Sequence, residues 1–194
     1  GRNGLLTRTG SMVPKLLASA GYHVILRPHP QSFISDREVM ERVAADLQTC
    51  KNVEWDRNPD GFSSLSRASL MVSDVSGVIF DFAFVFLRPD ISVGNGPLKE
   101  GFEAWEIPHE AWEMKALDLI GRRVPAGNES VIPTMVEEML GDLTTQTEAI
   151  RRVRDENVVN FGHAGGPIAD ALVAAAQAHS VQLQSSLHSS VEAA

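Results

Sequence analysis

The chain has 194 residues, of which 43% are hydrophobic and 22% charged, enough for one domain of ordinary size with a substantial core. Its formal net charge of −8 argues against a dedicated nucleic-acid-binding protein, because affinity for a phosphate backbone comes mostly from Lys and Arg. No apolar run approaches the ~20 residues that span a bilayer, and the single cysteine, Cys50, cannot form an internal disulfide. We therefore expect a cytoplasmic protein in a reducing compartment.

The first part of the chain alternates short apolar strands with amphipathic helices. Ser11 is placed to cap the first helix and Gly21 to end it. Ser35-x-x-Glu38 forms a capping box that predicts the start of another helix. The predicted elements are, in order, a helix over 12–20, a strand over 22–26, a helix over about 36–48, a brief strand at 53–55 and a short helix ending near 68.

The second part continues the alternation and then becomes helical. Thr145-x-x-Glu148 is a second capping box. The predicted elements are a strand over 70–73, a helix over 78–86, a strand over 90–93, a mixed region over 98–125 with a strand near 117–124, and helices over about 131–140, 145–158 and 167–181. We predict a domain over 1–181, followed by a helical or disordered tail over 182–194.

The alternation of strands and helices predicts an α/β fold, a Rossmann-like doubly wound parallel sheet with helices on both faces. In such sheets ligands bind beyond the carboxyl ends of the strands, where loops lead into helices. Three loops satisfy that rule, namely 27–35, 73–78 and 94–101.

The loop after the 22–26 strand carries donors suited to a phosphate. Arg27 offers a planar fork of N–H groups, and His29 is held between two prolines and donates or exchanges a proton near neutral pH. Ser32 follows as a further donor. The alternative is a loop in which the prolines only fix a turn and His29 bonds to the backbone.

The loop after the 70–73 strand leads directly into an apolar helix. Ser76 is placed to cap that helix, and the N–H groups around Gly77 would form an anion site. Asp81 follows in an otherwise apolar turn, where a carboxylate needs a partner unless it faces solvent. The alternative is that Asp74 and Ser76 act only as capping residues. The run from Asp74 also resembles the nucleophile loop of haloacid dehalogenase-like phosphatases, but Ser76 replaces the acid/base aspartate of that family.

Taken together, Arg27-Pro28-His29-Pro30, Ser73-Asp74-Val75-Ser76 with the later Asp81, and Arg88-Pro89 resemble a known family. The order and spacing are similar to the C-terminal half of CDP-glycerol glycerophosphotransferases, the teichoic-acid polymerases and primases, over about residues 1–95. The resemblance implies the C-terminal, nucleotide-binding half of a two-domain GT-B architecture. It also implies that His29 and Ser76 contact the donor pyrophosphate, with Arg27 and Ser32 as neighbours and Asp81 at the family's carboxylate. Gly77 departs from the family, which has a second serine there.

The resemblance further implies a transferase of cell-envelope synthesis that moves glycerol phosphate from CDP-glycerol to a hydroxyl of a polyol-phosphate or glycan acceptor. The catalytic base is expected on an N-terminal domain, which this chain lacks, so the chain alone is expected to be inactive. We expect the chain, which opens on Gly1 without Met, to be a piece of a longer protein that contacts the inner face of the membrane peripherally. No metal and no cofactor are predicted. The alternatives are a GT-B glycosyltransferase, a UDP-sugar 2-epimerase-like domain and a non-catalytic nucleotide-binding module.

Overall fold

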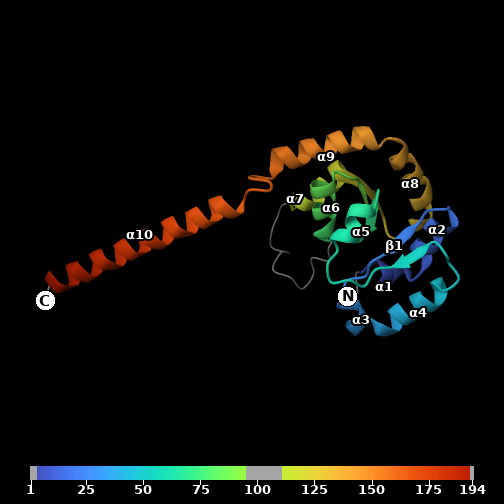
Figure 1. Cartoon of the computed structure of the whole chain (residues 1–194), viewed down its shortest axis with the longest axis horizontal. Helices are drawn as coiled ribbons and strands as arrows, with labels where there is room; N and C mark the ends of the chain where they lie inside the picture. The colour runs from blue at the N-terminus through green and yellow to red at the C-terminus, as the bar shows by residue number, and fades with distance from the viewer. Residues whose placement is uncertain (1–3, 95–110, 193–194) are drawn as a thin grey trace. The chain divides into compact units, whose positions relative to one another are not determined.

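The computed structural model describes residues 4–94 and 111–192, with side chains described as far as residue 179 (Figure 1). The chain divides into two compact units, Gly1–Arg154 and Asp155–Ala194. In chain order the elements are α1 Leu5–Thr9, α2 Met12–Ser19, β1 Val24–Leu26, α3 Ser32–Ser35, α4 Arg37–Leu47, β2 Val53–Trp55, α5 Phe62–Arg67, β3 Met71–Ser73, α6 Val78–Phe86, β4 Asp90–Val93, α7 Trp112–Ile120, β5 Gly121–Val124, the 3-10 helix η2 Glu129–Val131, α8 Ile132–Gly141, α9 Leu143–Asn157 and α10 Gly165–Glu192.

The strands confirm the prediction of an α/β fold with parallel pairing. They form two small sheets, however, where the sequence predicted one. In the first sheet β1 pairs with β2, and in the second the order is β3–β4–β5. Every pair is parallel, with Val24 opposite Val53 in the first sheet and Met71 opposite Asp90 in the second.

The main core lies on one face of the second sheet. Ile91 and Val93 of β4 are fully buried and pack against Val13 of α2 and Val136 of α8. Because side chains alternate along a strand, this pattern leaves Asp90 and Ser92 on the opposite face. A smaller core holds the first sheet to α4 through Leu26 and Val43.

The predicted helix over 78–86 and strand over 90–93 match α6 and β4. Leu87 adopts a left-handed conformation, with φ of 53°, and ends α6 before Pro89. The predicted capping boxes are absent. The Ser35 hydroxyl instead contacts the Gln31 carbonyl and Asp36, while Thr145 lies inside α9.

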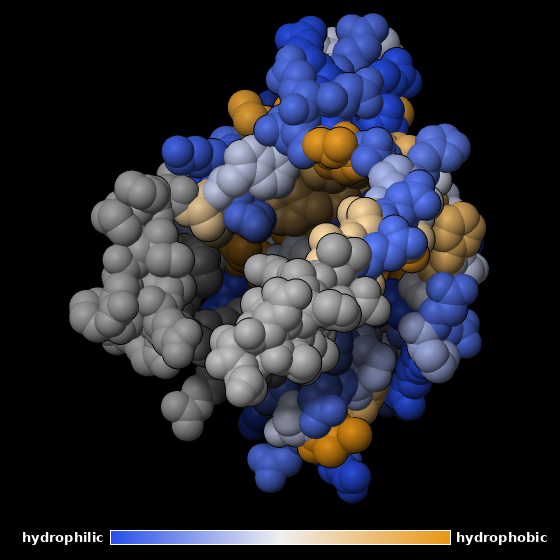
Figure 2. All heavy atoms as spheres, turned by 90° about the vertical axis from the view of Figure 1, so that its left-hand side faces the viewer, coloured by the Kyte–Doolittle hydropathy of each residue, from blue (hydrophilic) through white to orange (hydrophobic). Residues whose placement is uncertain are grey.

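The second unit consists of a short connection and the helix α10. The predicted boundary after residue 181 falls inside this helix, since α10 runs from Gly165 to Glu192. Asn160 and Gly162 have positive φ angles in the connection between α9 and α10. None of the helices over the described residues is both long and apolar enough to cross a bilayer. On the face drawn in Figure 2 hydrophilic side chains dominate, and hydrophobic ones show in patches and within a hollow.

Asp90 is a buried carboxyl without a hydrogen-bond partner. Neither of its oxygens is paired, and the neighbouring Ser92 hydroxyl is unpaired as well. On the adjacent strand a Cβ at Gly121 would lie 2.8 Å from Asp90 Cγ, so only glycine fits beside this side chain. Removal from water disfavours the charged form, and burial therefore raises the pKa of Asp90 to about 7.

Asp90→Asn is expected to change how stability depends on pH. As the pH rises from 4 toward 7 the unfolded state loses this proton before the folded state does, so the wild type loses stability over that range and levels off above it. A pKa raised from 3.8 to about 7 corresponds to roughly 4 kcal/mol, and the variant should lack this loss. Urea unfolding at pH 5 and pH 8 measures the difference, with the exposed Asp170→Asn as control. Parallel pH profiles for Asp90→Asn and wild type would contradict the assignment.

Candidate functional site

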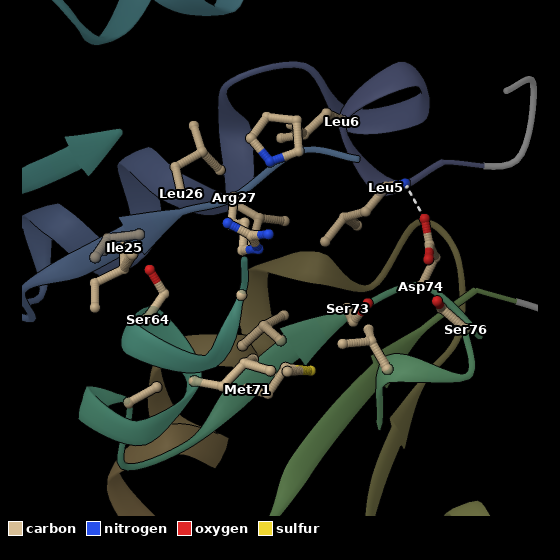
Figure 3. A pocket seen from close by; sticks show the side chains of 18 of the residues that line it. Leu5, Leu6, Ile25, Leu26, Arg27, Ser64, Met71, Ser73, Asp74 and Ser76 are labelled. Atoms are coloured by element: carbon tan, nitrogen blue, oxygen red, sulfur yellow. Dashed lines mark hydrogen bonds between the residues drawn. The ribbon is translucent and has the colours of Figure 1, made fainter. Parts of the chain in front are cut away.

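A cavity of about 1770 Å³ lies where the loops after β1 and β3 meet (Figure 3). Five of the six residues predicted to bind the donor line this cavity, and the loops that carry them are some 45 residues apart in sequence. They are Arg27, His29, Ser32, Ser76 and Asp81. Gly77 does not line it, although Ser76 and Val78 on either side do. The third predicted loop, 94–101, lies outside the described residues apart from Gly94.

Arg27 is held by the loop that follows β2. Its Nη1 donates to Asp56 Oδ2 at 2.7 Å and to the Asn58 carbonyl at 2.8 Å, and its Nη2 donates to the Pro59 carbonyl at 3.1 Å. The guanidinium also packs close to Gly61, where an added Cβ would lie 3.1 Å from Nε. Arg27 therefore fixes the wall of the cavity with most of its donors and keeps only part of its fork for a ligand.

Asp56 anchors this arrangement. It is almost fully buried and accepts hydrogen bonds from the Ser64 hydroxyl, from the Asn58 N–H at 2.9 Å and from Arg27. The Ser64 and Asn58 hydrogen bonds, followed by that of Arg27, lower the pKa of Asp56 to about 2. No sequence signal predicted the role of Asp56, because its charged partner Arg27 becomes a neighbour only when β1 and β2 pair.

His29 is exposed at the rim of the cavity. Its Nδ1 accepts the Gln31 N–H at 3.1 Å, so the neutral ring carries its proton on Nε2. This contact is the hydrogen bond to the backbone that the alternative interpretation expected. It nevertheless orients the ring and leaves Nε2–H as a donor for an oxygen anion.

The start of α6 differs from the prediction in one detail. Gly77, and not Ser76, occupies the N-cap position, and no side chain caps the helix. Gly77 has an ordinary helical φ of −55°, and a Cβ there would meet nothing within 4 Å. The N–H groups of Ile79 and Phe80 already donate to the Ser76 and Gly77 carbonyls. The Ser76 hydroxyl and the N–H groups of Gly77 and Val78 are thus the donors that this turn offers to an anion. Asp81 is exposed on the first turn of α6, where it lines the cavity wall.

Two polar contacts from α1 complete the cavity, and no sequence signal predicted them. Asp74 accepts the Leu5 N–H at 2.8 Å, which fixes the start of α1 beside the end of β3 (Figure 3). Arg8 donates to the Val93 carbonyl at 2.7 Å and brings a cation to the end of β4. Across the described residues, no cluster of three or more His, Cys, Asp or Glu side chains could hold a metal ion.

Comparison with protein-family models, with curated proteins and with solved structures finds no match to this chain. The site must therefore be interpreted from its own geometry. That geometry consists of an oriented imidazole, a hydroxyl and the N–H groups of Gly77 and Val78 at the carboxyl ends of parallel strands, with two arginines at the wall.

Asp56→Asn is expected to lower the melting temperature at pH 7, because it removes the charge that Ser64, Asn58 and Arg27 stabilise. A carboxylate whose pKa is lowered in the folded state stabilises the protein above its unfolded pKa, and this contribution disappears as the pH falls from about 4 to about 2. Thermal unfolding between pH 2 and pH 7 should therefore show the two proteins converging in acid. Asp60→Asn, in the same loop, serves as the control, and a constant gap at every pH would contradict the prediction.

Proposed function

We propose that this protein is the donor-binding half of a GT-B transferase and binds the diphosphate of a nucleotide-diphosphate donor in the cavity between the loops after β1 and β3. The observation that carries the proposal is the convergence of the Arg27–Ser32 loop and the Ser76 loop on one cavity. Parallel strands with intervening helices support a Rossmann-like domain of this kind. CDP-glycerol is the proposed donor, on the resemblance of the two loops to the glycerophosphotransferases.

The donors around the cavity suit a diphosphate. The amides at the start of α6 lie at the positive end of the helix dipole, and the Ser76 hydroxyl adjoins them. His29 offers Nε2–H from the opposite loop, and Arg8 and Arg27 add positive charge at the wall. These few local groups could hold a phosphate despite the overall charge of −8.

The proposed reaction is a displacement at phosphorus. An acceptor hydroxyl attacks the phosphorus that carries glycerol, the P–O–P bridge breaks, CMP leaves, and the hydroxyl proton passes to a base. Helix amides and His29 would stabilise negative charge on the leaving phosphate, as oriented donors do in a water-poor site. We place the base and the acceptor site on an N-terminal domain, which would also supply the peripheral membrane contact of the full-length protein.

A second candidate function is a non-catalytic nucleotide-binding module. The observation that favours it is the engagement of Arg27 by Asp56, Asn58 and Pro59, which leaves fewer free donors than a transferase site would use. The two functions differ in one measurement. A transferase releases CMP from CDP-glycerol when the full-length protein and an acceptor are present. A binding module binds CDP-glycerol but does not cleave it, so no CMP forms.

His29→Ala is expected to weaken donor binding about tenfold, because it removes the oriented Nε2–H donor, and a hydrogen bond to a charged group contributes roughly 1.5 kcal/mol or more. Isothermal titration of CDP-glycerol, UDP-N-acetylglucosamine and CMP into both proteins measures the effect. His163→Ala, in the second unit, controls for loss of a histidine elsewhere. Equal affinity of wild type and His29→Ala, or no binding of any of the three, would contradict the proposed site.

Gly77→Ser is expected to strengthen donor binding several-fold and to leave stability unchanged or slightly higher. The space around Gly77 is open and its backbone is helical, so a serine fits without strain, reduces the conformational entropy of the unfolded chain and adds a hydroxyl donor between Ser76 and Val78, which both line the cavity. Titration with CDP-glycerol and a thermal melt measure the two effects, with Gly77→Ala as the matched control. An equal gain for Ala and Ser would show that the hydroxyl contributes nothing.

A further inference from the structure

The same cavity lies between two strand edges, of β1 and β3, that have no partner strand among the described residues. In a parallel ladder alternate residues turn their N–H and C=O groups toward opposite neighbours. The Val24 N–H donates to the Asn52 carbonyl, and the Leu26 carbonyl accepts the Asp56 N–H. The backbone groups of Val24 and Leu26 therefore face β2, and those of Ile25 face away from it. The Met71 N–H donates to the Pro89 carbonyl. The backbone groups of Met71 and Ser73 therefore face β4, and those of Val72 face away from it.

Ile25 and Val72 both line the cavity, on β1 and β3 respectively. Their outward backbone groups therefore face the same space, where no described residue forms a partner strand. An unpaired backbone group away from water costs free energy comparable to a lost hydrogen bond. A ligand held at the carboxyl ends of the strands would leave these mid-strand groups unpaired.

The size and lining of the cavity fit a polypeptide better than a small molecule. Its volume of about 1770 Å³ exceeds the roughly 300–1,000 Å³ of ordinary ligand pockets. Apolar side chains of four helices contribute to its wall, namely Val13 and Leu17 of α2, Val136 of α8, Leu65 of α5, and Val85 and Phe86 of α6. Apolar cover of this kind surrounds a central strand of a parallel sheet.

The position of α1 fixes the direction of such a strand. Leu5 and Arg8 are bonded to Asp74 and to the Val93 carbonyl, at the carboxyl ends of β3 and β4. A strand that ran into Gly4 from the cavity would therefore end where β3 and β4 end, parallel to them. The chain then passes through α1 and α2 to β1, a connection long enough for a βαβ crossover.

We propose that a short apolar β-strand, in polypeptide that leads directly into Gly1, fills this cavity between β1 and β3. It runs parallel to both, pairs with the backbone groups of Ile25 and Val72, and joins the two sheets in the order β2–β1–inserted strand–β3–β4–β5. It spans three or four residues, because β1 and β3 have three residues each and β4 has four.

Amide hydrogen exchange on an extended chain tests this proposal. The probe is the segment Lys-Val-Ile-Val-Val-Thr fused directly before Gly1, and the matched control is Lys-Val-Pro-Val-Pro-Thr, in which two prolines remove strand N–H donors. In the unextended chain the amides of Ile25 and Val72 should exchange at least tenfold faster than those of Val24 and Met71, which already have acceptors. The Val-rich extension should slow Ile25 and Val72 at least tenfold, and the proline extension should not.

Three outcomes would overturn the proposal. The first is protection of Ile25 and Val72 in the dilute, unextended chain. The second is unchanged exchange of both amides in a Val-rich fusion whose β4 and β5 amides remain protected. The third is protection that appears only as the concentration of the unextended chain rises, because a second copy would then be the occupant. Nucleotide titration into the unextended chain tests the donor site without the strand, so the failure of one proposal is distinguishable from the failure of the other.

Discussion

Parallel pairing of the strands is the constraint on which the candidate site depends. Two parallel neighbours place their carboxyl ends at the same edge, and the loops that leave them must meet there. β1 and β2 bring the Arg27 loop against Asp56 in this way, and β3 and β4 bring Asp74 near the end of Val93. Within each sheet, pairing thus gathers side chains that are far apart in sequence. β1 and β3 belong to different sheets, and the loops after them meet at the cavity.

Most of the charged side chains discussed at the carboxyl ends of the strands form hydrogen bonds that hold the loops in place. Asp56 binds Arg27 and Ser64, Asp74 holds the start of α1, and Arg8 caps the end of β4. A rigid wall of this kind pre-organises the groups that remain, and orientation lowers the entropic cost of binding. The groups that remain are an imidazole N–H, a hydroxyl and two backbone N–H groups at the start of α6, and the residues that carry the first two line one cavity.

The sequence predicted the elements that strong apolar patterns determine, and it failed at two helix starts and where a partner is distant. The apolar run of α6, ended by Arg88-Pro89, and the four-residue strand β4 were predicted with their bounds. The capping boxes failed because Ser35 bonds to Gln31 and Asp36, and because α9 begins two residues before Thr145. Likewise, no pattern near Arg27 revealed that Asp56, 29 residues later, would engage it.

The gap between β1 and β3 bears on the candidate site as well as on the pairing of the strands. A strand inserted between β1 and β3 would end between the His29 loop and the Ser76 loop, because Leu5 is already fixed to Asp74 at that edge. The turn after such a strand, near Gly4, would then lie against the same anion as His29 and the α6 amides. Glycine permits close approach of backbone to a ligand, and backbone N–H groups in such a turn are common phosphate donors. The polypeptide that completes the sheet would therefore also complete the proposed binding site. The His29 loop and the start of α6 would form two sides of that site, and the turn near Gly4 would form the third.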